Sequence, residues 1–197
     1  MRVRPSAIPE VVILEPEVHA DERGFFLETF RQDTLRDAGI ATPWVQDNHS
    51  RSVRGVLRGM HFSVGGGQAK LVRCARGAVW DVAVDIRRGS PTFGRWAAVT
   101  LDDVAHRQVH IPVGFAHGFF VLSEVADVVY RCSAYYDSET ERAFAWDDPD
   151  VAIAWPEAPS NVSARDASAP RLAEIADRLP FVYRESDAVS TASHSRR

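Results

Sequence analysis

Several residue types and patterns are scarce in this chain of 197 residues. It has 2 cysteines, Cys74 and Cys132, and each lies in an apolar, strand-like run, so we expect a buried reduced pair and no disulfide framework. No apolar run approaches the roughly 18 residues of a membrane span, and residues 1–16 do not show the pattern of a signal peptide. We therefore expect a cytoplasmic protein that has no membrane partner.

An excess of charge of one sign is also lacking. The 23 basic and 27 acidic residues give a net charge of -4, and no basic surplus favours a nucleic-acid partner. Lysine is almost absent, because of the 23 basic residues only Lys70 is a lysine. A lysine ammonium is a compact point charge, whereas arginine presents a planar fork. The composition therefore raises the question of which task at position 70 needs a lysine and could not be met by an arginine.

The sequence is rich in short β-branched and aromatic runs that are separated by Gly, Pro and Asp turns. The strand candidates are residues 69–75, 79–86, 96–101, 108–111, 119–122 and 128–135. The first two are separated by Arg76-Gly77, which predicts a hairpin. Short helices are expected over residues 33–38 and 171–178.

Regularly spaced strands without alternating helices predict an all-β antiparallel sandwich or barrel. We expect one domain over residues 1–180, followed by a C-terminal extension over residues 181–197 that is partly disordered. In the run 70–75, alternation places Lys70 and Arg73 on opposite faces of the strand. One of the two must point inward if this strand is central, but register alone does not say which.

Two histidines lie in glycine-containing motifs. Residues 112–117 read Pro-Val-Gly-Phe-Ala-His, which is typical of the second half of the metal-binding signature of cupin barrels. The first half usually supplies two histidines in the pattern His-x-His and a carboxylate. The matching stretch of this chain has only one histidine, His61, and the second half adds His117. A metal site generally needs three or more convergent ligands. We therefore expect a cupin-like pocket that works with no metal and no other cofactor.

A histidine, a lysine and a tyrosine in such a pocket suit proton abstraction next to a carbonyl group. A neutral histidine is a competent base, and an ammonium stabilises the enolate oxygen. A tyrosine across the pocket can return a proton to the other face, and Tyr130, Tyr135 and Tyr136 are candidates. Arg23 and Arg58 would suit a diphosphate, although surface ion pairs explain them equally well.

Six segments together resemble the dTDP-4-dehydrorhamnose 3,5-epimerase family, whose members are nucleotide-sugar epimerases with a cupin-like jelly-roll barrel. The segments are residues 21–28, 45–62, 68–94, 111–123, 129–148 and 163–170, and they cover most of residues 8–170. Their joint occurrence in this order is far more specific than any single short motif.

The resemblance implies roles for individual residues. His61 matches the family's base, and Asp166 matches the carboxylate that orients it. Tyr130 matches the proton donor on the opposite face, and Lys70 matches the residue at the keto group. Further positions match substrate contacts: Arg23, Phe26, Glu28, Gln46, Asn48, Arg58, His117, Glu141 and Arg165. The first three of these match nucleotide contacts that come from a partner subunit, so a homodimer is implied. Asp81 either helps to place Lys70 or forms a structural ion pair.

The implied substrate is a dTDP-4-keto-6-deoxy sugar, whose C4 keto group acidifies the protons on C3 and C5. The expected reaction inverts both centres and yields dTDP-4-dehydrorhamnose. A mono-epimerase remains open, because residues 62–69 are rich in glycine where relatives often carry bulkier residues. More distant alternatives are a ketoisomerase on the same sugar, a non-catalytic cupin that binds the sugar nucleotide, and a metal-dependent cupin oxygenase.

Overall fold

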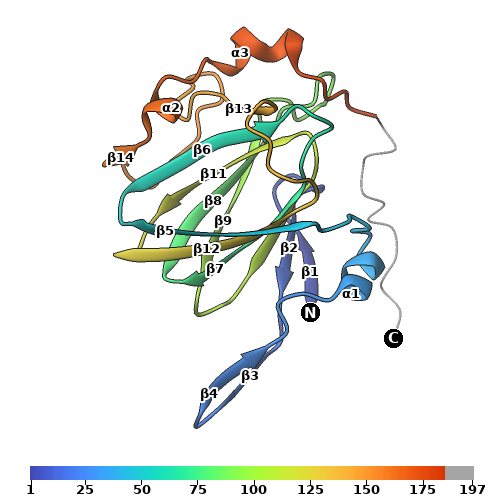
Figure 1. Cartoon of the computed structure of the whole chain (residues 1–197), viewed down its shortest axis with the longest axis vertical. Helices are drawn as coiled ribbons and strands as arrows, with labels where there is room; N and C mark the ends of the chain where they lie inside the picture. Colours follow the sequence, from blue (N-terminus) through green and yellow to red (C-terminus); the bar gives the residue numbers. More distant parts are fainter. Residues whose placement is uncertain (185–197) are drawn as a thin grey trace.

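The computed structural model describes residues 1–184 and is built on two antiparallel sheets (Figure 1). The first sheet has the strand order β1 (Arg2–Pro5), β2 (Val12–Glu15), β10 (Gln108–Ile111), β7 (Lys70–Arg76), β12 (Val125–Cys132) and β5 (Gln46–Val53). The second has the order β13 (Glu141–Ala143), β6 (Val56–Ser63), β11 (Phe115–Val121), β8 (Ala78–Asp85) and β9 (Trp96–Asp102), with β14 (Asn161–Val162) parallel to β6.

A few short elements lie outside these sheets. They are the hairpin of β3 (Val18–Asp21) and β4 (Gly24–Leu27), the helices α1 (Gln32–Asp37), α2 (Ala164–Ala167) and α3 (Leu172–Ile175), and the 3-10 turn η1 (Ala176–Arg178). The hairpin extends away from the two sheets at the bottom of Figure 1, whereas α2 and α3 lie beyond the second sheet at the top. Within residues 1–184, none of the helices has the length and apolar character to cross a membrane.

The space between the sheets is filled largely by apolar side chains from both of them. This core includes Val72, Cys74, Val79, Ala83, Phe115, Phe119, Val121 and Val128. A second cluster, with Met60, Phe62, Val84, Phe144, Leu172 and Leu179, packs the outer face of the second sheet under α3. The two-sheet, mostly antiparallel arrangement confirms the predicted all-β jelly-roll class.

The strand prediction is confirmed in several places and wrong in one. The strand predicted over residues 108–111 is β10 (Gln108–Ile111), and the predicted helix 33–38 is α1 shifted by one residue. The predicted hairpin at Gly77 is wrong, because β7 pairs with β10 and β12 whereas β8 pairs with β11 and β9. Gly77 has a φ of 77° and lies against the backbone of Val125, so this short link carries the chain from one sheet to the other.

The start of the predicted C-terminal extension is part of the body. The carbonyl of Phe181 accepts a hydrogen bond from the Arg88 amide, and the Tyr183 amide donates to the Arg88 carbonyl. The packed part of the chain therefore continues past the predicted boundary at residue 180. The remainder of the extension, residues 185–197, lies outside the described residues.

A buried ion-pair network closes the end of β8. Asp85 is fully buried and accepts hydrogen bonds from Arg87 Nε at 2.9 Å and from the hydroxyls of Ser90 at 2.6 Å and Thr92 at 2.7 Å. Burial would raise the pKa of Asp85, but these hydrogen bonds outweigh it and hold the pKa below its usual range. Arg87 also pairs with Glu10 at 3.0 Å, which ties the N-terminal segment to this turn.

We expect the Asp85→Asn substitution to lower the free energy of unfolding by about 3 kcal/mol, because it leaves the Arg87 guanidinium buried without its main counter-charge. Urea denaturation measures the change. A matched control is Glu157→Gln, which removes the exposed Arg54–Glu157 pair and should change stability by less than about 0.5 kcal/mol. Equal losses in the two variants would show that the Asp85 network does not hold the fold together.

Candidate active site

The strand register gathers polar side chains on the inward face of the first sheet. Cys132 in β12 is the Cα partner of both Lys70 in β7 and Gln46 in β5. One row further along, Tyr130 is the partner of Asn48. Since alternate residues of a strand face the same side, all five side chains lie on the face that carries the inter-sheet core.

Lys70 lies on the inward face of β7. Its alternate neighbours Val72 and Cys74 belong to the inter-sheet core, whereas Leu71 packs in the cluster on the outer face, to which Arg73 also turns. The structure therefore places Lys70 on the inward face and Arg73 on the outer face, a choice that alternation alone leaves open. Only 8% of Lys70 is exposed, and burial lowers the pKa of its ammonium, although the charges of Glu141 and Asp81 oppose this shift.

Tyr130 is the neighbour of Lys70 on this wall. The Lys70 ammonium nitrogen lies 5.8 Å from the centroid of the Tyr130 ring. Burial raises the pKa of the Tyr130 hydroxyl, while the charge of Arg58 and a hydrogen bond with Asn48 act in the opposite direction. The hydroxyl is therefore held in its protonated form, and it can donate a proton.

The opposite wall, on the second sheet, carries two histidines. His61 in β6 and His117 in β11 are direct Cα partners. His117 Nε2 lies 2.8 Å from Asp81 Oδ2, and both side chains are buried. Burial lowers the pKa of His117 in spite of the Asp81 charge. Asp81, for which the sequence left two interpretations open, is thus hydrogen-bonded to His117 and within electrostatic range of Lys70.

His61 is paired with Asp166, which comes from a distant part of the chain. His61 Nε2 lies 2.7 Å from Asp166 Oδ1, and the second carboxylate oxygen accepts the Gly59 amide at 3.3 Å. A carboxylate only accepts, so Nε2 carries the proton and Nδ1 keeps its lone pair for a substrate. Burial would raise the pKa of Asp166, but the bonds from His61 and Gly59 outweigh it and lower the pKa.

Local geometry explains how Asp166 reaches His61. Ser163 caps α2, and its side chain accepts the Asp166 amide at 3.1 Å, which fixes the first turn of the helix.

Next to His61, the backbones of Gly59 and Gly118 touch, and a Cβ at Gly59 would lie 2.6 Å from the Gly118 Cα. Glycine is needed here because any side chain would force β6 away from β11.

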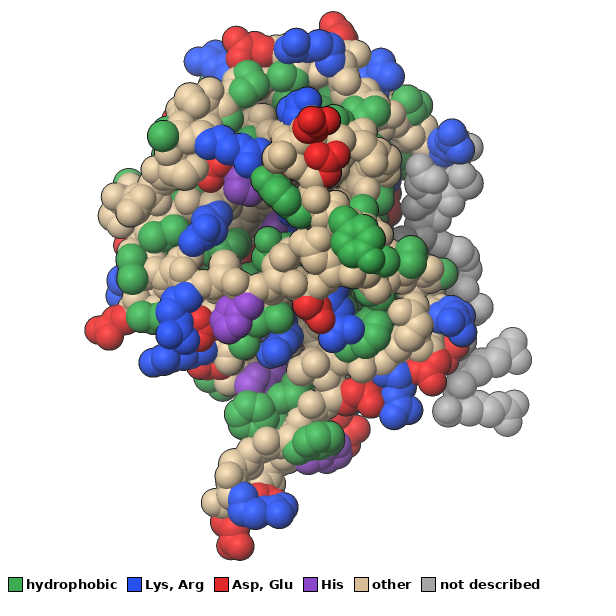
Figure 2. All heavy atoms as spheres, viewed as in Figure 1, with side chains coloured by type: hydrophobic (Ala, Val, Ile, Leu, Met, Phe, Trp, Pro, Cys, Tyr) green, Lys and Arg blue, Asp and Glu red, His purple; other side chains and the backbone are tan. Residues whose placement is uncertain are grey.

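Charged side chains surround the entrance to this interior. Arg58 Nε donates to Ser52 Oγ at 3.0 Å, and Arg165 pairs with Glu141 at 2.9 Å. Arg58, Arg165 and His61 line a cavity of about 290 Å³. Figure 2 shows a recess on this side of the molecule, with histidine side chains inside it and basic side chains around it.

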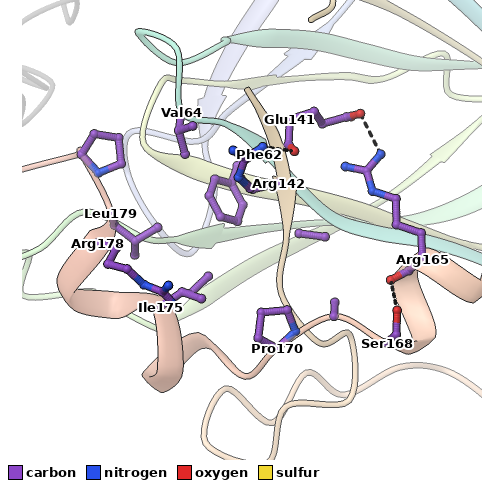
Figure 3. Close-up of a pocket in the computed structure, with 13 residues that line it drawn as sticks. Phe62, Val64, Glu141, Arg142, Arg165, Ser168, Pro170, Ile175, Arg178 and Leu179 are labelled. Atoms are coloured by element: carbon purple, nitrogen blue, oxygen red, sulfur yellow. Dashed lines mark hydrogen bonds and ion pairs between the residues drawn. The ribbon is translucent and has the colours of Figure 1, made fainter. Parts of the chain in front are cut away.

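A larger cavity of about 630 Å³ lies on the other side of the Glu141–Arg165 pair. In Figure 3 the side chains of Phe62 and Val64 point into it, and Ile175 faces them from α3. It belongs to the outer face of the second sheet, where Phe62 is part of the apolar cluster under α3. No histidine–carboxylate pair lines this cavity, so the acid–base groups are all in the inter-sheet interior.

Three of the residues expected to bind substrate are not brought to this interior within the chain. Arg23 lies at the tip of the β3–β4 hairpin, paired with Asp21. Phe26 in β4 is 71% exposed, and Glu28, just after it, pairs with Arg31 at 2.9 Å. The hairpin that carries Arg23 and Phe26 extends away from the sheets (Figure 1).

Two neighbours of the site were not singled out from the sequence. The sequence predicts Cys132 only as a buried reduced thiol, and in the structure it is free and buried. Alternation from Tyr130 to Cys132 would have placed its thiol on the same inward face. Ser52, which accepts the hydrogen bond from Arg58, had no sequence signal beyond alternation along β5.

Within residues 1–184, no group of three or more His, Cys, Asp or Glu side chains could hold a metal ion.

The jelly-roll fold and the histidine–carboxylate pair inside it define a cupin-class protein with an acid–base site. A family model described as dTDP-4-dehydrorhamnose 3,5-epimerase matches residues 5–174. The chain is 51% identical over 175 residues to the dTDP-4-dehydrorhamnose 3,5-epimerase of Salmonella typhimurium, covering 87% of this chain and 96% of that one. It is 45% identical over 197 residues to a dTDP-4-dehydrorhamnose 3-epimerase of Streptomyces niveus, covering 98% and 95%.

Solved structures agree with these relatives. The crystal structure of the Legionella pneumophila dTDP-6-deoxy-D-glucose-3,5-epimerase in complex with dTDP-4-keto-L-rhamnose matches with a TM-score of 0.90 and 46% identity, covering 93% of this chain and 98% of that one. The Mycobacterium tuberculosis epimerase matches with a TM-score of 0.89 and 40% identity, covering 95% and 96%. This chain belongs to the dTDP-4-dehydrorhamnose 3,5-epimerase family.

Because Lys70 is the only lysine, its ionisation can be observed directly. In protein labelled with 15N-lysine, we expect the single ammonium resonance to titrate below the ordinary lysine pKa of 10.5, since burial disfavours the charged form. The same labelled protein unfolded in urea provides the reference titration. A folded-state pKa equal to or above the unfolded one would contradict the desolvated environment described for Lys70.

Proposed function

We propose that this protein epimerises a dTDP-4-keto-6-deoxyhexose at C3 and C5 and yields dTDP-4-dehydrorhamnose. One observation carries the proposal. The His61–Asp166 pair lies on one wall of the inter-sheet interior, and Lys70 and Tyr130 lie on the facing wall. A base and an acid on opposite sides of a bound sugar can remove a proton from one face and return one to the other.

The first step is removal of a proton from C3 or C5 by His61 Nδ1. The C4 keto group makes these protons acidic, because the electron pair left on carbon is delocalised onto the keto oxygen. Asp166 holds the imidazole in the required tautomer through the 2.7 Å bond to Nε2, and it stabilises the imidazolium that forms. His61 and Asp166 are 105 residues apart in the sequence, and α2 places Asp166 next to His61.

The enolate oxygen formed in this step needs a positive partner. Lys70 supplies a compact charge in an interior where little water screens it, so its interaction with the oxygen is strong. Tyr130 then gives its hydroxyl proton to the opposite face of the same carbon, which inverts the centre. Proton exchange with solvent then returns the His61 imidazolium and the Tyr130 phenolate to their starting forms. Proton transfers alone therefore complete the reaction, and no change of oxidation state is required.

The nucleotide part of the substrate would be held at the entrance. Arg58 and Arg165 supply guanidinium groups for the diphosphate. The exposed hairpin residues Arg23 and Phe26 are free to reach the site of a second copy, and Glu28 follows them in sequence. We therefore propose a homodimer in which each hairpin contributes to the partner's nucleotide site. The two free cysteines fit the reducing environment of the cytoplasm, which we propose as the location.

A mono-epimerase is the second candidate function. The observation that favours it is the match to the Streptomyces niveus 3-epimerase, which extends over 98% of this chain. The 3,5-epimerase of Salmonella typhimurium has higher identity but covers 87%. Both reactions use the same base, acid and ammonium, so the number of inverted centres distinguishes them.

Incubation with dTDP-4-keto-6-deoxyglucose in D2O tests the proposal. We expect deuterium at both C3 and C5, because Tyr130 exchanges its proton with solvent before it reprotonates carbon. Mass spectrometry and proton NMR of the sugar measure the incorporation. Deuterium at one centre only would support the mono-epimerase.

The matched variant for this experiment is His61→Ala, in which exchange should fall by at least about 100-fold because the base is lost. Wild-type protein that exchanges neither centre would refute the epimerase function and favour the non-catalytic binding protein. Near-normal exchange by His61→Ala would refute the role of His61 while leaving the reaction class intact.

A further inference from the structure

We propose that Cys132 is a positioning residue for the epimerisation, because its thiol anchors the carboxamide of Asn48, the cross-strand partner of Tyr130. The proposal rests on the proposed function. It assigns a task to a side chain that neither the composition nor the family motif connects with the chemistry. Its support comes from the strand register and from a chain of hydrogen bonds along the inward face of the first sheet.

Cys132 lies at the centre of this wall. It is 1% exposed, and the register places it between Lys70 on one side and Gln46 on the other. Tyr130 is two residues earlier in the same strand and therefore faces the same side. Burial raises the pKa of its thiol, whereas the charge of Lys70 and the hydrogen bond with Asn48 act to lower it. Cys132 thus adjoins both the proposed proton donor and the proposed enolate partner.

A chain of three hydrogen bonds ends at the Cys132 sulfur. The Tyr136 amide donates to Gln46 Oε1 at 2.8 Å, and Gln46 Nε2 donates to Asn48 Oδ1 at 2.9 Å. Asn48 Nδ2 then donates to Cys132 Sγ at 3.4 Å. Both ends of the Asn48 carboxamide are therefore fixed. A flipped amide would place its NH2 group against the NH2 group of Gln46, and its oxygen against the sulfur.

The fixed carboxamide matters because Asn48 is the direct cross-strand partner of Tyr130, so the two side chains adjoin on the same face of the sheet. A proton donor must be held within hydrogen-bonding reach of the carbon that it protonates, and a small displacement lowers the rate of that step. By holding Asn48, the Cys132 thiol restricts where the Tyr130 hydroxyl can lie. Cys132 thus acts through Asn48, without touching the reacting atoms.

A thiol suits this place beside Lys70. Burial raises the pKa of Cys132, although Lys70 opposes the shift, so the group stays a neutral thiol. A carboxylate in the same position would pair with the ammonium and weaken its attraction for the enolate oxygen. A neutral sulfur can accept from Asn48 while it leaves the charge of Lys70 available to the substrate.

The other cysteine provides a matched control. Cys74 is also 1% exposed and lies in the same inter-sheet core, but its thiol donates to the Arg76 carbonyl at 2.9 Å. No hydrogen bond connects it with Asn48 or Tyr130 among the described residues. Cys74→Ala and Cys132→Ala remove the same atom from equally buried positions, and only the second removes an anchor of Asn48.

The test compares steady-state kinetics of these variants with the dTDP-4-keto sugar. We expect Cys132→Ala to lower kcat about tenfold while KM changes by less than about threefold, because the acid is misplaced more than binding is weakened. Cys132→Ser, which restores an acceptor for Asn48, should recover most of the loss. Cys74→Ala should stay within about twofold of the wild type.

A double-mutant cycle isolates the coupling between Cys132 and Asn48. If the thiol acts through Asn48, adding Cys132→Ala to Asn48→Ala should lower kcat by less than about twofold further. Multiplicative losses in the cycle, or equal losses in Cys132→Ala and Cys74→Ala, would overturn the proposal. A wild-type protein without solvent exchange would instead defeat the proposed function, and this proposal with it.

Discussion

The burial of ionisable groups between the two sheets is the constraint on which the rest of the structure depends. A charge or polar group in such an interior must have a partner, because it has lost most of its hydration. His61 and His117 each have a carboxylate, Asp166 and Asp81, at 2.7 and 2.8 Å. Lys70, with 8% of its surface exposed, faces the same interior, where burial lowers the pKa of its ammonium and the charges of Glu141 and Asp81 oppose this shift.

This constraint explains why several residues around the site are held in place by close contacts and hydrogen bonds. The Gly59–Gly118 contact sets the distance between β6 and β11, and therefore between the two histidines. The Ser163 cap aims Asp166 at His61 from outside the sheet. The catalytic proposal therefore depends on positions that touch no substrate, and the same holds for Cys132.

The sequence predicts the parts of the molecule that depend on local pattern. The strand at residues 108–111 follows from a β-branched run, and the placement of Lys70 and Arg73 on opposite faces follows from period-two alternation, although alternation does not say which of them points inward. The course of the chain at Gly77 was not predicted correctly, because a turn signal cannot distinguish a return to the same sheet from a passage to the other sheet. Which strands become neighbours is decided by the packing of the whole core.

The site was predictable mainly through family resemblance. Asp166 is separated from His61 by 105 residues, so no spacing rule could connect them. The hydrogen bond that His117 donates to Asp81 and the place of Cys132 beside Asn48 require the three-dimensional register. The hairpin residues Arg23 and Phe26 remain away from the interior of their own chain, and their use depends on a second copy.

The central claim is that a bound hexose lies between the second sheet, which carries the base His61, and the first sheet, which carries the acid Tyr130. A crystal structure of the protein with a dTDP-hexose tests it most directly. The account predicts the hexose in the inter-sheet interior, with His61 Nδ1 against one face of the ring and the Tyr130 hydroxyl against the other. A hexose in the outer cavity beside Phe62, or one with both groups on the same face, would contradict it.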